Sequence, residues 1–200
     1  MFAFQVCGYH KSGKTSTLTG LVEKLRANGA AVASVKNIHK EDFRLDEEGT
    51  NTDRHTRAGA CPVVARAAGE TDFLYSRQLD MHEIRSAISA DWLAVEGYNE
   101  FPLPKIVCGK DESEADVFID RRTFALAGVL SSSRCQYRGL RVFNPLDEKD
   151  AADLFTLVME TVFPMLPYVD DECCGRCGLT CTAMTEAIVQ GEKTVEDCRI

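Results

Sequence analysis

The sequence predicts an α/β fold: a mainly parallel β-sheet covered by helices, followed by a small cysteine-rich module at the C-terminal end. Three observations predict this arrangement. Short β-branched and aromatic runs alternate with helical patterns along most of the chain, which is typical of a parallel sheet. A glycine-rich turn joins the first of these runs to the first helical pattern. Finally, five of the nine cysteines fall within residues 172–198.

The expected elements follow from hydrophobic periodicity and from the residues that end each run. Leu18, Leu21, Val22 and Leu25 recur at the spacing of one helix face, and Gly29 ends that helix. Acidic residues begin the last long helix, as suits a helix N-terminus. Strands are expected at 2–7, 31–36, 61–66, 72–76, 91–97, 104–109, 124–130 and 140–144, and helices at 14–28, 79–89 and 147–163.

Composition limits the class of protein. A chain of 200 residues with 44% apolar content can bury one main core, and a net charge of -8 opposes a nucleic-acid partner. We find no signal-peptide core and no run long enough to span a bilayer, so we expect a cytoplasmic protein without a membrane partner. Thiols stay reduced there, so clustered cysteines favour metal chemistry, whereas Cys7, Cys61, Cys108 and Cys135 are expected to be small core residues.

Residues 8–15, Gly-Tyr-His-Lys-Ser-Gly-Lys-Thr, match the pattern G-x-x-x-x-G-K-[ST] between a strand and a helix. This pattern indicates the P-loop NTPase fold: backbone N–H groups surround phosphate oxygens, Lys14 reaches the terminal phosphates, and the Thr15 hydroxyl binds Mg²⁺. Glu96 ends an apolar strand, where an acid can serve the same metal; an ordinary strand-end acid is the alternative. No N-K-x-D element is present, so these motifs predict a nucleotide but not its base.

The charged stretch 36–60 is expected to be a loop that could close over the nucleotide. Its candidates for contacts with phosphate, metal or attacking water are Lys36, His39, Asp53, Arg54 and His55. A solvated charged loop without a role in binding is the alternative. The catalytic candidates are therefore Lys14, Asp53 and Glu96, with no role assigned among them.

Three segments taken together, "GYHKSGKTS", "VKNIHKEDFRLDEEGTNTDRHTRAGA" and "LAVEGYNEFPLPKI", resemble the molybdopterin-guanine dinucleotide biosynthesis protein B family over about residues 1–165. The resemblance implies a dimeric fold that binds GTP with Mg²⁺, hydrolyses it slowly, and assists a nucleotidyltransferase that joins GMP to molybdopterin. By position it implies that Thr15 and Glu96 serve Mg²⁺. The chain departs from the family pattern at Asn51, where an acid is expected, so a second metal-linked carboxylate is present only if Asp53 replaces it. The nucleotide-binding residues that it implies are Gly8, Tyr9, His10, Lys11, Ser12, Gly13, Lys14, Thr15, Ser16, Lys36 and His39.

The C-terminal cysteines have the spacing Cys174-x2-Cys177-x3-Cys181-x16-Cys198. Three thiolates close together and one distant thiolate suit a [4Fe–4S] cluster; zinc, or cysteines without metal, are the alternatives, and Cys173 could replace Cys174. The intervening residues 182–191 predict a short helix, and the segment locally resembles the four-iron module of corrinoid/iron–sulfur proteins. We expect a nucleotide-binding domain over 1–166 and this module over 167–200.

The combined motifs predict a GTP-binding accessory protein for the guanylylated molybdenum or tungsten cofactor that also carries a cluster. Two alternatives remain. One is a regulatory module that senses redox state or cluster loading and uses the nucleotide fold as a switch. The other is a P-loop kinase, although the sequence shows no clear arginine-bearing lid.

Overall fold

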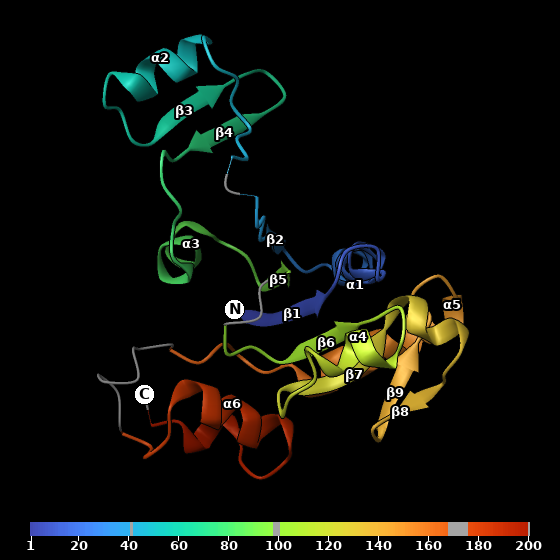
Figure 1. Cartoon of the computed structure of the whole chain (residues 1–200). Helices are drawn as coiled ribbons and strands as arrows, with labels where there is room; N and C mark the ends of the chain where they lie inside the picture. The colour runs from blue at the N-terminus through green and yellow to red at the C-terminus, as the bar shows by residue number, and fades with distance from the viewer. Residues whose placement is uncertain (41, 98–100, 168–175, 200) are drawn as a thin grey trace. The chain divides into compact units, whose positions relative to one another are not determined.

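Figure 1 shows the chain as a computed structural model, which describes residues 1–40, 42–97, 101–167 and 176–199. The chain divides into two compact units. One, here called the sheet unit, comprises Met1–Asn37 and Ser89–Ile200, and the other, the inserted unit, comprises Ile38–Ile88. The sheet unit holds the main β-sheet. In the sequence, the inserted unit lies between two strands of that sheet.

The main sheet has seven strands in the order β2-β5-β1-β6-β7-β9-β8. Every neighbouring pair is parallel except β8 and β9, which are antiparallel. This confirms the predicted mainly parallel α/β fold. The strands are β1 (Phe2–Gly8), β2 (Val32–Lys36), β5 (Trp92–Glu96), β6 (Lys105–Cys108), β7 (Thr123–Ala127), β8 (Gln136–Tyr137) and β9 (Leu140–Phe143).

Two long helices, α1 (Lys14–Ala27) and α5 (Glu148–Thr161), pack against one face of this sheet. The predicted apolar stripe of α1 is confirmed, because Leu18, Leu21 and Leu25 are buried there with Leu154 of α5. Asp147 caps α5 by accepting a hydrogen bond from the Asp150 N–H, which explains the acidic start read from the sequence. This face forms the largest apolar core of the sheet unit.

Three short elements between β6 and β9 were not predicted. They are helix α4 (Glu112–Asp116), the 3₁₀ helix η1 (Gly128–Ser132) and strand β8. Each spans at most five residues, which is too short for hydrophobic periodicity to reveal.

The inserted unit contains β3 (Val63–Arg66), β4 (Thr71–Leu74), α2 (Asn51–Arg57) and α3 (Met81–Ala87). The two strands form a separate antiparallel hairpin and not part of the parallel sheet, because only four residues, 67–70, separate them. The expectation of a plain loop over 36–60 was also wrong, since it contains α2. That helix has polar side chains throughout and begins at Thr50, whose side chain accepts from the Asp53 N–H.

The C-terminal tail forms helix α6 (Cys181–Val189) and the 3₁₀ helix η2 (Val195–Asp197). The predicted helix over 182–191 is thus confirmed to within two residues. Met184 is buried on α6 against Phe163 and Leu166, and Gly191 follows the helix with a φ of +71°. The proposed domain boundary between 166 and 167 borders residues 168–175, which lie outside the described ranges, and it stays a prediction.

The scattered cysteines divide into two pairs. Cys7 and Cys108 are buried, as predicted, but Cys61 and Cys135 are exposed, so that part of the prediction was wrong. Both exposed residues lie in bends just before short strands. Cys135 lies between Arg134 and Gln136, whose polar side chains favour the surface. Across the described ranges, no helix has both the length and the apolar character that crossing a membrane requires.

Candidate functional site

The loop between β1 and α1 turns so tightly that two of its positions require glycine. At Gly8, with a φ of +144°, a Cβ atom would lie 2.0 Å from the Cys108 carbonyl oxygen. At Gly13, with a φ of +100°, a Cβ would lie 2.7 Å from the Cα of Gly128. Both positions therefore exclude side chains, and the backbone of the loop is free to approach a ligand closely.

The start of α1 suits an anion. Within the described ranges no side chain caps this helix, and its first turn contains no acidic residue, so the first N–H groups can face a phosphate. Ser12 Oγ is buried and has no hydrogen-bond partner among the described residues, as expected of a hydroxyl that a bound oxyanion would satisfy. Lys14 Nζ lies across the loop and donates to the Tyr9 carbonyl oxygen over 2.5 Å.

Glu96 stands at the end of β5, beside the loop. The Thr15 hydroxyl donates to Glu96 Oε1 over 3.0 Å, and Lys36 Nζ lies 3.1 Å from the same oxygen. Strand register explains the second contact, because Lys36 pairs with Glu96 across β2 and β5. A hydroxyl and a carboxylate side by side are oxygen ligands of the kind that Mg²⁺ prefers.

The layer behind the loop is rigid and unreactive. The Val129 N–H donates to the Ser12 carbonyl oxygen over 3.1 Å, so the turn after β7 holds the loop from behind. Burial raises the pKa of Cys7 to about 11 and that of Cys108 to about 12. These thiols stay protonated at neutral pH, and they serve as packing rather than as nucleophiles.

The inserted unit holds four of the candidates predicted from the charged stretch. His39, Arg54 and His55 are exposed, whereas Asp53 is buried. Asp53 Oδ2 accepts from the Gly49 N–H over 2.9 Å and lies 2.9 Å from Arg57 Nε. The Gly49 hydrogen bond, together with Arg57, holds the pKa of Asp53 below its usual value. Asp53 thus fixes the segment before α2, and the roles of these four residues at the phosphate loop stay predictions.

The predicted cluster ligands lie in the tail. Cys177 and Cys198 pack against the apolar cluster around Met184, and Cys181 is buried at the first residue of α6. Cys174 lies outside the described residues. In the ranges that the structure describes, no three His, Cys, Asp or Glu side chains are gathered closely enough to hold a metal ion. The ligand set therefore stays a prediction.

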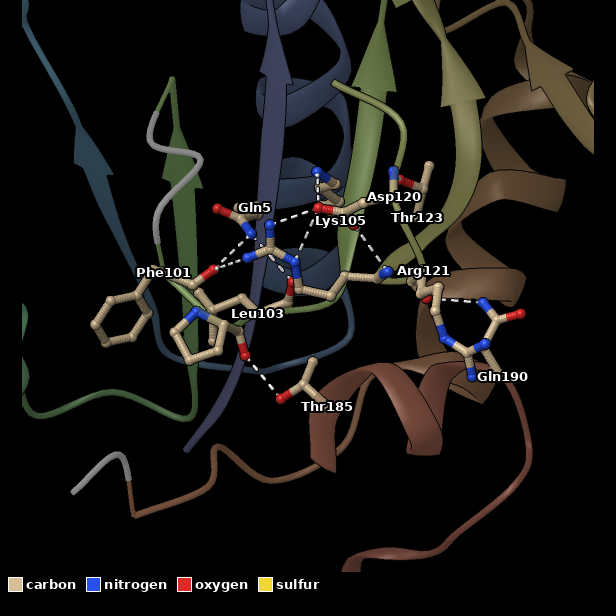
Figure 2. A network of polar contacts seen from close by, with 11 residues as sticks. Gln5, Phe101, Leu103, Lys105, Asp120, Arg121, Thr123, Thr185 and Gln190 are labelled. Carbon is tan, nitrogen blue, oxygen red and sulfur yellow. Dashed lines mark hydrogen bonds and ion pairs between the residues drawn. The ribbon is translucent and has the colours of Figure 1, made fainter. Parts of the chain in front are cut away.

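Sequence reasoning missed a buried polar layer on the face of the sheet opposite α1 and α5. Figure 2 shows its members, among them Gln5, Lys105 and Asp120. Lys105 is fully buried, and its Nζ lies 2.7 Å from Asp120 Oδ2. The signal was present in the sequence, because a glutamine and a lysine interrupt the otherwise apolar strands "FAFQVC" and "KIVC".

Two family models match the chain. The model described as "Molybdopterin guanine dinucleotide synthesis protein B" matches residues 3–131, and the one described as "Putative Fe-S cluster" matches residues 172–200. The first match covers the phosphate loop, Lys36 and Glu96. The second covers all four cysteines predicted to bind a cluster.

Similar proteins agree with the first match. A Methanocaldococcus jannaschii protein named "Putative molybdopterin-guanine dinucleotide biosynthesis adapter protein" is 29% identical, covering 96% of this chain and 74% of its own length. A Bacillus subtilis protein named as a probable adapter of the same biosynthesis is 26% identical over 72% of this chain and 85% of its own. The crystal structure of Bacillus subtilis MobB aligns with a TM-score of 0.65 at 24% identity, covering 78% of this chain and 98% of that one. This structural likeness shows the fold.

Proposed function

This chain belongs to the molybdopterin guanine dinucleotide synthesis protein B family, and we propose that it is a GTP-binding adapter in the biosynthesis of the guanylylated molybdenum or tungsten cofactor. Its relatives are named as adapter proteins of this biosynthesis. The partner in this proposal is the nucleotidyltransferase that joins GMP to molybdopterin. Guanine is chosen over adenine on the family alone.

The observation that carries the nucleotide part is the contact of Thr15 with Glu96 beside an uncapped helix start. In the proposal, the N–H groups of residues 8–16 and Lys14 bind the phosphates, while Thr15 and Glu96 hold Mg²⁺. Bound Mg²⁺ supplies positive charge that neutralises the phosphate oxygens. Lys36 orients the Glu96 carboxylate, and the family resemblance adds His39 as a further nucleotide-binding residue.

Slow hydrolysis fits the partners of the candidate carboxylates. Glu96 is engaged by Thr15 and Lys36, and Asp53 by Gly49 and Arg57. A carboxylate that holds Mg²⁺, as proposed for Glu96, is a poor base for water, and so is one whose pKa is lowered, as for Asp53. We therefore propose that the chain acts mainly by binding GTP and that turnover is weak.

For the tail, we propose that Cys174, Cys177, Cys181 and Cys198 hold a [4Fe–4S] cluster, with zinc as the alternative. All four donors are thiols, which are the usual ligands of such clusters. A cluster would supply one-electron chemistry or a structural staple. The apolar packing of Cys177 and Cys198 around Met184 would shield it from water.

The remaining parts of the proposal rest on the family resemblance. We propose a homodimer that works in the cytoplasm. Sedimentation at micromolar concentration with GTP and Mg²⁺ tests the dimer, and a strictly monomeric species counts against it.

The nucleotide site is tested by Lys14→Ala in the full chain. We expect loss of tight GTP binding, measured by calorimetry, with the fold intact by circular dichroism, because the change removes a phosphate-facing cation from a loop. Lys24→Ala, which removes the same charge at the other end of α1, is the matched control and should bind like wild type. Unchanged affinity in folded Lys14→Ala would refute the site.

The metal part is tested on anaerobically purified protein by iron, sulfide and zinc analysis. Cys177→Ser should lose or destabilise the cluster, whereas Cys173→Ser should retain it, since Cys173 is the spare thiol of the spacing. One zinc per chain without labile sulfide would replace the cluster with a structural zinc site.

A further inference from the structure

Helix α6 docks on the buried segment formed by residues 101–104. Figure 2 shows the Thr185 hydroxyl pointing from α6 to this segment, where it donates to the Pro102 carbonyl oxygen over 2.8 Å. Thr185 is completely buried. Two residues beyond the helix add contacts to Arg121: Gln190 Nε2 donates to its carbonyl oxygen over 2.7 Å, and Glu192 pairs with its guanidinium at 2.6 Å.

Two of the four residues of the segment are proline, which has no N–H to donate, and side chains supply most of the donors to its carbonyl oxygens. Gln5 Nε2 donates to the carbonyl oxygens of Phe101, over 2.9 Å, and Leu103, over 3.0 Å. Arg122 Nη1 also donates to the Phe101 carbonyl oxygen, over 2.8 Å. The Gln5 N–H donates to Pro104. Thr185 completes the set, so each of the four carbonyls has a donor and α6 supplies one of them.

The same segment is the continuation of the chain from Glu96. The Gly97 N–H donates to the Val6 carbonyl oxygen over 3.0 Å, and Phe101 is held by Gln5, the residue before Val6. Val6 also pairs with Glu96 across β1 and β5. Adjacent residues of β1, Gln5 and Val6, therefore contact both the segment and the end of β5 that carries Glu96, so β1 connects the two.

The polar layer beside the segment restricts the movement of Phe101. Arg122 Nη2 lies 2.5 Å from Asp120 Oδ2, which also pairs with the fully buried Lys105. These directional contacts fix Arg122, and through it Phe101, in one arrangement. The tail contacts the neighbours of both residues in the hydrogen bond between Arg122 and Phe101. Thr185 donates to Pro102, and Gln190 donates to Arg121. Closely packed, hydrogen-bonded groups transmit a shift rather than yield to it.

We infer that α6 positions the Glu96 carboxylate through residues 101–104 and β1, so that binding of the Mg²⁺–nucleotide complex and docking of α6 on this segment are energetically coupled. The inference rests on the nucleotide site proposed above and adds its regulation. Thr185 is the positioning residue, because it acts on Glu96 through Pro102. Coupling of this kind is reciprocal. Contacts that stabilise the docking of α6 strengthen Mg²⁺–nucleotide binding, and the bound complex stabilises that docking by the same factor.

The first experiment compares Thr185→Val with wild type in the full chain. Valine keeps the volume and removes the donor to Pro102. With a fluorescent, non-hydrolysable GTP analogue, we expect Thr185→Val to need about five times more Mg²⁺ for half-maximal binding. Affinity in EDTA should not change, because Lys14 and the loop are untouched. Thr185→Ser keeps the hydroxyl and should restore the wild-type requirement.

Thr182→Val is the matched control, since Thr182 lies on the same helix and has no hydrogen bond to residues 101–104 among the described contacts. The second readout is hydrogen–deuterium exchange of the α6 amides. In wild type and Thr182→Val, binding of the Mg²⁺–analogue complex should slow amide exchange across α6. The factor should be about the same as the change in Mg²⁺ requirement that Thr185→Val causes. In Thr185→Val this protection should disappear.

The outcomes separate the two proposals. A wild-type Mg²⁺ requirement and undiminished α6 protection in Thr185→Val overturn the coupling and leave the nucleotide site standing. A wild-type chain that does not bind the analogue with Mg²⁺ overturns both. If Thr185→Val does not fold, Gln190→Ala removes an exposed contact of the same docking and should raise the Mg²⁺ requirement about twofold. No change in that variant also overturns the coupling.

Discussion

The two faces of the main sheet are built from the same strands but by different chemistry. On one face, Phe4 and Val6 of β1 lie with Ile106 of β6 in an apolar core under α1 and α5. Gln5, between Phe4 and Val6, and Lys105, which precedes Ile106, point to the other face. There they form hydrogen bonds and an ion pair. The second face also has an apolar cluster, around Val107 and Leu126, beside its polar layer. Apolar packing needs side chains of the right volume, whereas the polar layer needs donors and acceptors in fixed positions.

The two kinds of side chain also differ in the free energy of burial. Apolar side chains gain free energy on leaving water, whereas a buried ammonium must recover its lost hydration from partners. Burial lowers the pKa of Lys105, although Asp120 opposes the shift. For Asp120, burial would raise the pKa, but hydrogen bonds from Arg122 and Lys105 outweigh it and the pKa is lowered. The polar face is therefore specific in geometry and sensitive to the loss of one member.

Asp120→Ala should have the largest effect, because it removes the carboxylate shared by Lys105 and Arg122. Loss of one partner of a buried ion pair costs about 3–5 kcal/mol, and we expect about 3 kcal/mol here because the Asp120 side chain is 33% exposed. Urea unfolding followed by circular dichroism measures the loss.

Leu154→Met on the apolar face is the matched comparison. Leu154 is a buried residue of α5, and the change conserves volume, so we expect a loss of about 1 kcal/mol. If the two variants lose equal stability, the contrast between the faces is wrong.

The sequence predicts the apolar face better than the polar one. The stripe of Leu18, Leu21 and Leu25 has a helical period, and the apolar runs of β1 and β6 indicate strands, so these elements were predicted, whereas the order of the strands in the sheet was not. The partners of Gln5 and Lys105 could not be predicted, because Asp120, Arg122 and the carbonyls of 101–104 meet them only through the packing of parallel strands. A polar residue inside an apolar strand indicates that a partner exists, but not which one.

The same limit applies to the candidate site. The loop, Thr15 and Glu96 were predicted because a strand, a glycine pattern and a helix occur in sequence. The pairing of Lys36 with Glu96 depends on the register of β2 with β5, which local pattern does not determine. In the inserted unit, strands β3 and β4 were predicted, but their pairing as a separate hairpin was not. Helix α2 was missed because a short polar helix is stabilised by its cap and carries little periodicity.

Acid should weaken the polar face and not the apolar one. The folded-state pKa of Asp120 is below its usual value, so its contribution is complete above the unfolded pKa of about 3.9 and is lost as the pH falls through the folded pKa. Unfolding free energies at several pH values between about 5 and 2 should therefore fall less steeply in Asp120→Asn than in wild type. Profiles of identical slope would show that Asp120 is not coupled to its two cations.

Arg121→Ala should have the smallest effect on stability, although Arg121 is next to Arg122 in the chain. Its guanidinium pairs with Glu192 at 2.6 Å, but both side chains are 55% exposed, so water already satisfies much of their charge. Exposed pairs contribute about 0–1 kcal/mol, and we expect a loss of about 0.5 kcal/mol by urea unfolding. The Gln190 hydrogen bond to the Arg121 carbonyl oxygen persists, because it does not use the side chain. A loss above about 2 kcal/mol would mean that the exposed pair, and not buried Thr185, carries the docking of α6.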